Sequence, residues 1–421
     1  MNEWDNMTIA GFQRQLAAGN ASSLDWWAAC RERIDACESS IQAWEYLALE
    51  PTVAMPAKDG PLPALFGVPV AIKDIIDTQR MPTTWGTRGY HCVAASDMDA
   101  AIVTQLARLG ALPMGKTVST EYAYFQPSKT RNPHDTRLTP GGSSSGSAAA
   151  VASGMVPVAL GTQTVGSIIR PASYCGVVGF KPTHGTISTS GVKALAPSMD
   201  TVGWFSRSVE DSCILFSLLT GAAPVRRLGS LNGIRIAVCP LPSTPPLSPD
   251  VKTAIDEAAM RLTAQGASVT PLRLGPVFDE LVTHQQVILA YEAAHALASE
   301  RIRFGESMSR PLQALLEDGR RLSLERYWQS RQAAEHARHE ISAHFTERVD
   351  AILAPSATGA APEGLDSTGD PLYSRAWTLL GGPCLNLPMH RTSEGLPVGI
   401  QLVADRFKDA HLLAIAGVLM T

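Results

Sequence analysis

Residues 138–169 carry no charged side chain, although the stretch is built mostly of glycine, serine, alanine and threonine. Segments that lie in solvent normally carry Lys, Glu or Asp, so we expect this segment to be mostly buried. It cannot be a membrane span, because glycines, prolines and hydroxyl groups interrupt every candidate apolar run of about 18 residues. Burying so many hydroxyl groups is costly unless they are used, so we expect chemistry around Ser143 and Ser167.

The composition is that of a globular protein with a substantial core. The chain has 421 residues, of which 45% are hydrophobic and 18% charged, which allows one large α/β domain or two ordinary ones. The formal net charge is −4 and the Lys and Arg residues are scattered. We therefore expect neither a nucleic acid nor a membrane as a partner.

The amino terminus and the cysteines both favour a cytoplasmic protein. The first residues show no basic region followed by an apolar core, so no signal peptide is predicted. The seven cysteines are widely spaced, and none forms a CxxC pair. This pattern predicts free thiols in a reducing compartment and gives no support to a zinc site.

Hydrophobic periodicity along the chain alternates between helical spacing and short apolar runs. The first fifty residues follow the spacing of two helices, and residues 68–72 are a dense apolar run typical of a buried strand. No internal repeat is visible, and no linker is long enough to separate two domains. The alternation predicts a single large α/β domain around a mostly buried sheet flanked by helices. Further helices are expected at 99–109, 148–152, 251–265 and through 281–345, and strands at 231–238, 268–272 and 351–353.

Three short motifs match catalytic patterns but lack the context that those patterns need. Residues 110–117 match the P-loop, yet a helix is expected before them, so a helix-to-strand connection is favoured. Residues 142–146 match the GxSxG nucleophile elbow, but no apolar strand precedes them, which leaves an α/β-hydrolase esterase as a lesser alternative. Residues 190–193 match SxxK without the companion motifs of penicillin-binding enzymes.

The two serine clusters form a better candidate site. A serine nucleophile needs an adjacent base and donors aimed at the developing oxyanion. Small residues in 162–167 would let successive backbone N–H groups converge near Ser167, although a tight Gly-Ser turn is the simpler interpretation. Ser143 precedes a short helix whose first N–H groups would stabilise an anion, with plain N-capping by Ser145 or Ser147 as the alternative.

Lys73 is the candidate base. It follows an apolar strand-like run, where burial would lower the pKa of its side chain and leave a neutral amine. On a strand, Asp74 would point to the opposite face and need not neutralise Lys73. The alternative is a lysine at the end of a strand whose ammonium group reaches water.

Taken together, these residues resemble the amidase signature family. The resemblance rests on residues 67–74 (Gly-Val-Pro-Val-Ala-Ile-Lys-Asp), on the Gly/Ser/Ala-rich run 141–152 and on residues 166–185. Ser143 and Ser167 are 24 positions apart, as the paired serines of the family are. The resemblance extends through residues 131–133, 195–203, 382–388 and 395–401, and leaves roughly 240–349 unmatched.

The resemblance implies a role for each candidate residue. Ser167 would be the nucleophile, Ser143, on a cis peptide bond, the proton relay, and Lys73 the neutral base. The backbone N–H groups of Thr164, Val165, Gly166 and Ser167 would form the oxyanion hole. No metal and no organic cofactor is implied.

The resemblance also implies the architecture. A single amidase signature domain would span residues 1–421 around a mixed β-sheet. It would consist of amino-terminal helices in 1–50, a catalytic core in 65–215, and a variable, mainly helical region on the substrate side in 240–349.

The chain departs from the family pattern around the proposed nucleophile. Gln163 stands where the family has an aspartate, and Val165 where it has a glycine. Ile169 replaces the arginine two positions after the nucleophile, and an arginine follows instead at Arg170. We interpret the lost acid and the displaced arginine as linked, as if a supporting ion pair had been rebuilt. Ser145 also replaces a glycine.

Hydrolysis of a carboxylic amide, with ester or carbamate hydrolysis as side activities, is the predicted function. The rivals are the A subunit of a glutamine-dependent tRNA amidotransferase and a catalytically dead binding protein. We expect a small-molecule amide as the partner, and a homodimer stays open. Because few charges lie near the site in sequence, an uncharged, partly apolar or aromatic substrate is favoured over a dianionic one. The substrate-side candidates are Trp85, Tyr122, Tyr124, Phe125 and the helical region 281–345.

Overall fold

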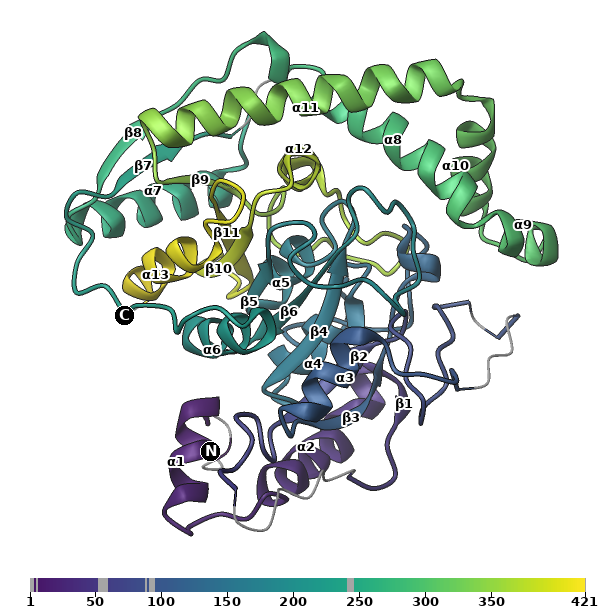
Figure 1. The fold of residues 1–421 in the computed structure, drawn as a ribbon, viewed down its shortest axis with the longest axis vertical. Helices are drawn as coiled ribbons and strands as arrows, with labels where there is room; N and C mark the ends of the chain where they lie inside the picture. The colour runs from purple at the N-terminus through teal and green to yellow at the C-terminus, as the bar shows by residue number, and fades with distance from the viewer. Residues whose placement is uncertain are drawn as a thin grey trace.

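A mixed β-sheet runs through the molecule, with helices packed against it (Figure 1). The computed structural model describes residues 4, 7–51, 60–87, 89, 90, 95–240 and 246–420. In those residues the sheet has eleven strands in the order β1-β3-β2-β4-β6-β5-β10-β11-β9-β7-β8. The strands are β1 (Trp44–Leu47), β2 (Pro69–Lys73), β3 (Leu112–Thr117), β4 (Val158–Gln163), β5 (Val178–Lys181), β6 (Thr201–Ser206), β7 (Arg235–Val238), β8 (Ser268–Pro271), β9 (Ala351–Pro355), β10 (Cys384–Arg391) and β11 (Pro397–Val403).

The sheet combines two parallel groups with antiparallel strands between them. Strand β2 pairs in parallel with β3 and β4, and β7 pairs in parallel with β8 and β9. All other neighbouring strands are antiparallel. The prediction of one α/β domain around a mixed, mostly buried sheet is confirmed.

Helices flank this sheet along its whole length. They are α1 (Ile9–Ala17), α2 (Asp25–Ile41), α3 (Ala101–Arg108), α4 (Ser145–Ala152), α5 (Ile169–Cys175), α6 (Val209–Thr220), α7 (Pro249–Ala264), α8 (Leu281–Ala296), α9 (Ala298–Phe304), α10 (Arg310–Arg321), α11 (Leu324–Glu347), α12 (Leu372–Leu380) and α13 (Asp409–Leu419), with short 3-10 turns at Glu121–Ala123 and Pro276–Phe278. No helix in these described ranges has both the length and the apolarity needed to cross a bilayer.

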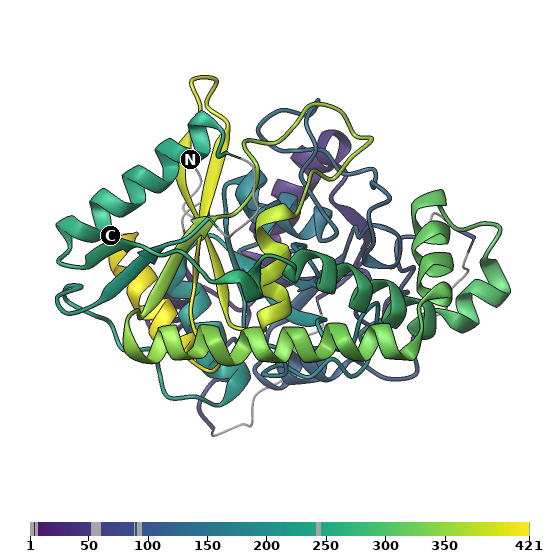
Figure 2. The ribbon, with the colours of Figure 1, turned by 90° about the horizontal axis from the view of Figure 1, so that it is seen from above.

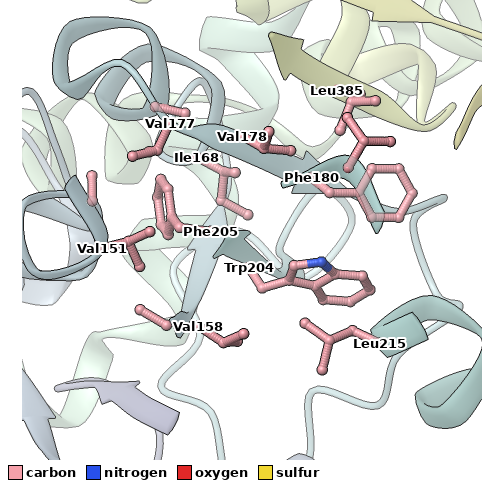
Figure 3. Packing of buried hydrophobic residues seen from close by; sticks show 14 of the residues in the cluster. Val151, Val158, Ile168, Val177, Val178, Phe180, Trp204, Phe205, Leu215 and Leu385 are labelled. Atoms are coloured by element: carbon pink, nitrogen blue, oxygen red, sulfur yellow. The ribbon is translucent and has the colours of Figure 1, made fainter. Parts of the chain in front are cut away.

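The centre of the core lies on both faces of β6. Phe205 points toward Val151 of α4, whereas its neighbour Trp204 points toward Leu215 of α6 (Figure 3). The ring centroids of Trp204 and Phe180 are 5.2 Å apart, so β5 and β6 share this packing. Because successive residues of a strand face opposite sides, α4 and α6 cover opposite faces of the sheet here.

The helical region after β8 forms a separate group beside the sheet. Helices α10 and α11 both pack on α8, and α9 follows directly after α8 beside this group (Figures 1 and 2). Helix α12 contacts both α8 and α11 and links this group to the core. The helical pattern predicted over 281–345 is confirmed.

Most predicted elements occur close to their expected positions, and several strands were not predicted. The two amino-terminal helices, the strand around 68–72 and the elements predicted in 231–272 are all present. Helix α3 and strand β3 confirm that the P-loop match is a helix-to-strand connection. The pattern of the sequence did not indicate β1, β4, β5, β6, β10 or β11. Strand β1 is a four-residue strand at the edge of the sheet with only one fully buried position, which leaves little periodicity to detect.

The described cysteines are free, as predicted. They are Cys30, Cys37, Cys175, Cys213, Cys239 and Cys384. Cys92 lies outside the described residues.

Candidate active site

The site forms where the parallel strands β2 and β4 end side by side. Strand β2 ends at Lys73, and β4 ends at Gln163. The loop after β4 carries Ser167 and leads into α5, while the loop before α4 carries Ser143. Ser143 and Ser167 line the same small pocket, so the fold brings the two serine clusters together.

Lys73 is fully buried, and within the described residues the hydrogen bonds of its amine go to hydroxyl groups alone. Its Nζ donates to Ser143 Oγ at 2.7 Å and to Thr162 Oγ1 at 2.8 Å. Desolvation holds the pKa of Lys73 well below its usual range, and the negative charge of Asp200 opposes that shift only in part. Burial therefore shifts Lys73 toward its neutral form, and a neutral amine can accept a proton.

Ser143 follows a cis peptide bond from Gly142, as the resemblance implies. Its carbonyl oxygen accepts a hydrogen bond from the Thr120 N–H at 3.1 Å, which fixes the backbone while the side chain contacts Lys73. The alternative interpretation, capping of α4 by Ser145 or Ser147, is wrong, because Ser144 occupies the N-cap position. Both serines lie inside the helix, where their hydroxyl groups donate to Gly141 and Leu160 carbonyl oxygens at 2.8 Å.

The loop from Thr164 to Ser167 has the backbone donors that an oxyanion hole requires. Among the described residues, the N–H groups of Val165, Gly166 and Ser167 reach no protein acceptor. The next two N–H groups, of Ile168 and Ile169, both donate to the Gln163 side-chain oxygen, at 2.9 and 3.0 Å. The loop thus presents a short run of free donors beside Ser167, bounded by donors that are already used.

Gln163 explains one departure from the family pattern. Its oxygen accepts two N–H groups at the start of α5, and its Nε2 donates to Thr378 Oγ1 on α12 at 2.9 Å. Thr378 in turn donates to the Val165 carbonyl oxygen at 2.6 Å. An amide side chain both accepts and donates, so it can serve the loop and the threonine at once, which a carboxylate cannot.

Asp200 is a buried residue of the site that sequence reasoning missed as functional. It accepts hydrogen bonds from Thr164 Oγ1 at 2.6 Å and from the N–H groups of Leu195 and Ala196 at 2.8 and 3.0 Å. Burial raises its pKa while these donors lower it. Asp200 therefore ties the loop after β4 to the segment before β6, and its position inside a motif of the family was the available signal.

Arg170 does not take part in the rebuilt ion pair that the sequence suggested, so that interpretation is wrong. Its Nη2 donates to the Gly142 carbonyl oxygen at 2.6 Å and to Thr368 Oγ1 at 3.1 Å. No carboxylate of the described residues lies within ion-pair distance of its guanidinium. Arg170 is 2% exposed and lines the same pocket as the two serines.

The four aromatic candidates lie in two different places. Tyr124 and Phe125 line the pocket of Ser143 and Ser167. Trp85 and Tyr122 are absent from that lining and pack against each other, with ring centroids 5.8 Å apart. Phe125 also lines a neighbouring hollow of about 440 Å³, to which Pro311 of the helical region contributes.

The GxSxG match is not a nucleophile elbow. Ser144 is fully buried, and its hydroxyl donates to the Thr162 carbonyl oxygen at 3.3 Å, which places it against β4. The residues before it form a loop in the described chain, with no strand feeding the turn. An α/β-hydrolase elbow requires that strand.

Fold and site together define the class of the protein as a hydrolase of C–N bonds built on the amidase fold. A model of the Amidase family matches residues 25–413, including the 240–349 region that the motifs left unmatched. The chain belongs to the amidase signature family.

Similar proteins include both amidases and components of amidotransferases. The A subunit of the Glutamyl-tRNA(Gln) amidotransferase of Symbiobacterium thermophilum is 33% identical, over 97% of this chain and 95% of its own. The native peptide amidase of Stenotrophomonas maltophilia superposes with a TM-score of 0.82 at 27% identity, over 99% of this chain and 97% of its own. A chain from a vestigial complex related to the origins of an s-triazine catabolic enzyme superposes with a TM-score of 0.88 at 26% identity, over 98% of each chain.

Proposed function

We propose that the protein hydrolyses a carboxylic amide through an acyl-enzyme on Ser167. The contact that carries this proposal is the one between Lys73 Nζ and Ser143 Oγ, 2.7 Å long and fully buried, in the pocket that Ser167 lines. A serine becomes nucleophilic when a base removes its proton, and a desolvated neutral lysine can supply that base through a second hydroxyl.

The proton moves along the same chain of groups in both halves of the reaction. Ser143 takes the proton of Ser167 as Ser167 attacks the amide carbonyl, and passes its own proton to Lys73. When the tetrahedral intermediate collapses, the proton returns through Ser143 to the leaving amine, and the acyl group stays on Ser167. Water, activated by the same groups, then attacks the acyl-enzyme and releases the acid.

The oxyanion of each intermediate would bind to the loop after β4. The N–H groups of Val165, Gly166 and Ser167, with that of Thr164, would stabilise the negative charge on the former carbonyl oxygen. Two buried anchors support the geometry of this loop: Asp200, which binds Thr164, and Thr378, which binds the Val165 carbonyl oxygen.

A second candidate function is that of the A subunit of a glutamine-dependent tRNA amidotransferase. The observation in its favour is the identity of 33% to such a protein over 97% of this chain. In this case the same site would hydrolyse glutamine, and the ammonia would pass to a partner. Copurification of a stable partner, or activity confined to glutamine, would favour this candidate.

The test is a substrate panel with two matched variants. Aliphatic amides, aryl anilides, carbamates and glutamine are assayed with the wild type, Ser167→Ala and Lys73→Ala. We expect amide turnover by the wild type, and mass spectrometry after a sulfonyl fluoride should locate the label on Ser167. Full activity in both variants would overturn the mechanism.

A further inference from the structure

We propose that a second cavity, between α6 and α13, binds a carboxylate that carries an apolar chain, such as the anion of a medium-chain fatty acid. This cavity, called the α6–α13 cavity below, shares no lining residue with the pocket of Ser143 and Ser167. The inference therefore goes beyond the proposed amide hydrolysis and does not depend on it.

The α6–α13 cavity is large and lies away from the catalytic residues. It has a volume of about 620 Å³, and the two helices that border it pack against each other (Figure 1). Helix α6 covers the face of the sheet opposite to α4, the helix that follows Ser143. Protein interiors contain few voids larger than a water molecule, so a space of this size is not a packing defect. Its volume falls within the range of about 300–1,000 Å³ that is typical of small-molecule sites.

The walls of the cavity are mostly apolar. Ile214 and Leu218 of α6 face it, together with Leu413 and Val418 of α13 and Val178 of β5. Ile214 and Leu218 pack against the core and yet are only partly buried. A ligand with an apolar chain would bury this remaining surface, and the hydrophobic effect favours that burial.

A segment with few attachments runs along the cavity. Residues 224–229, called the strap here, follow α6 and all line the cavity. In the described part of the chain, the backbone of the strap makes no hydrogen bond to the protein. The strap is held by Val225 and Leu228, which pack against the core, and by the ion pair of Arg227 with Glu210 of α6. A segment without backbone hydrogen bonds can be displaced at low cost, so the strap gives a ligand a way in.

The charges around the cavity favour an anion. Three arginines, Arg207, Arg226 and Arg227, line it, but only one acid, Glu210. Arg227 pairs with Glu210, and Arg207 donates to carbonyl oxygens of the amino-terminal segment. Arg226 is exposed and forms no ion pair with the described residues. The excess of positive charge beside an apolar cavity complements a molecule with an anionic head and an apolar chain, and guanidinium groups match carboxylates in geometry.

Helix α13 offers a position where the cavity can be filled without disturbing the fold. Gly417 lines the cavity, and a Cβ added there would meet no atom within 4 Å. Leucine is also a better helix former than glycine, so Gly417→Leu should fold. Gly275→Leu is the matched control, because a Cβ at Gly275 meets no atom within 4 Å either and this residue lines no part of the cavity.

The first test measures the chemical class of the ligand by calorimetry. Octanoate, decanoate and dodecanoate are titrated into the wild type below their micellar concentrations. We expect one ligand per chain and a Kd that falls roughly 4-fold for each added CH₂ group until the cavity is full. Decanoate should bind more tightly than decyltrimethylammonium, and added salt should reduce the difference. Absence of binding, or equal Kd values for the anion and the cation, would overturn the inference.

The second test locates the site with variants. Gly417→Leu should weaken decanoate binding by about 10-fold or more, since the loss of two buried CH₂ groups already costs that factor. Gly275→Leu should bind decanoate like the wild type. Arg226→Glu should weaken binding by about 2- to 5-fold, as expected for an exposed charge. Arg273→Glu makes the same change in net charge at an exposed residue outside the cavity and should have no effect. Unchanged binding by Gly417→Leu, with circular dichroism showing a folded protein, would place the acid elsewhere and exclude the site.

A thiol in the cavity gives an independent readout. Cys213 lines the cavity, and burial raises the pKa of its thiol to about 11, so its alkylation is slow enough to follow. Saturating decanoate should slow the labelling of Cys213 by N-ethylmaleimide, measured by peptide mass spectrometry. Cys37, which is also partly exposed but lies outside the cavity, should keep its rate. Equal slowing of both thiols contradicts the proposal. A copurifying polypeptide that shields Cys213, in a protein that binds no decanoate, would instead identify a protein interface and would also contradict it.

Discussion

Lys73 and Lys116 lie on neighbouring strands and are both fully buried, but their surroundings give them opposite chemistry. Lys73 contacts two hydroxyl groups. Lys116 lies 3.6 Å from the Asp74 carboxylate and also donates to the Ile76 carbonyl oxygen and to Thr83. Burial lowers the pKa of both side chains, to about 8 for Lys116, whose nearby acids oppose the shift, and well below the usual range for Lys73. The comparison shows that the nearest partners, and not burial alone, set how far the pKa of a buried lysine falls.

The pleat of the sheet separates the two environments. In the register of β2 and β3, Lys73 is paired with Thr117 and Ile72 with Lys116. Paired residues share a face and successive residues alternate, so the two lysines point to opposite faces. The Thr117 hydroxyl lies 2.7 Å from Ser147 of α4, which places Lys73 on the face that carries the active site.

The largest expected effect comes from removing Lys73. Lys73→Met should lower kcat by about 10²–10⁴-fold, because the reaction loses its base. The free energy of unfolding should fall by about 1–3 kcal/mol, since two hydroxyl contacts are lost but no ion pair is broken. Steady-state kinetics and urea denaturation measure the two quantities, with Ser167→Ala as the folded, inactive control. A large loss of stability without loss of kcat would reverse the roles assigned to the lysines.

The second effect is the converse, a loss of stability at the ion pair. Lys116→Met should lower the free energy of unfolding by about 3–5 kcal/mol at pH 7, where Lys116, with a pKa of about 8, is still charged, because it leaves Asp74 buried without its cation. Adding Asp74→Asn should restore much of the loss, as no charge then stays buried. Urea denaturation checks both variants, and the kcat of the folded fraction should stay near the wild-type value.

The loss of stability in Lys116→Met should depend on pH, and the pKa of Asp74 determines the direction of that dependence. Burial raises the pKa of Asp74 from 3.8 to about 6, even with Lys116 beside it. A carboxyl group with a raised pKa in the folded state contributes stability that is complete below pH 3.8 and is lost as the pH rises through 6. Without Lys116 the pKa of Asp74 should rise further, so the deficit of Lys116→Met should be smaller at pH 5, where Asp74 is protonated, than at pH 7. A deficit independent of pH would contradict the assignment to Asp74.

A smaller effect is expected on the pH at which kcat/KM falls on the acid side of the pH profile. Only the neutral amine of Lys73 can act as base, so kcat/KM should rise with pH through the pKa of Lys73 and then level off. The charge of Asp200 raises that pKa, against the larger effect of desolvation. Asp200→Asn should shift the midpoint of the limb to lower pH, whatever it does to the plateau by disturbing Thr164. A shift to higher pH would exclude this coupling.

The smallest effect is expected at the contact between α12 and the oxyanion loop. Thr378→Val removes the hydrogen bond to the Val165 carbonyl oxygen and should lower kcat about 2- to 12-fold with little change in KM. Thr378→Ser keeps the hydroxyl and serves as the matched control. An equal loss in both variants would show that packing, and not this hydrogen bond, matters at the position.

Much of the site could be predicted locally, since each candidate lies in a short, distinctive segment. Lys73 ends a predicted strand, and Ser143 and Ser167 lie in the uncharged run. The supporting contacts could not be predicted in this way. Gln163 and Thr378 are 215 positions apart, and no periodicity in either segment indicates that their side chains meet. The free donors of Arg170 depend in the same way on which acids the fold brings near.

The sequence by itself determined the alternation of helices and strands, the burial of residues 138–169 and the family to which the chain belongs. Those properties follow from the spacing of apolar residues along the chain and from the residue types within short segments. Only the tertiary structure decided which of two buried lysines has a carboxylate beside it, where Asp200 anchors the loop and which arginine of the described chain lacks a counter-ion. The physical reason is that pKa values and ion pairs depend on groups that are close in space, and the register of the sheet and the packing of α12 set those distances.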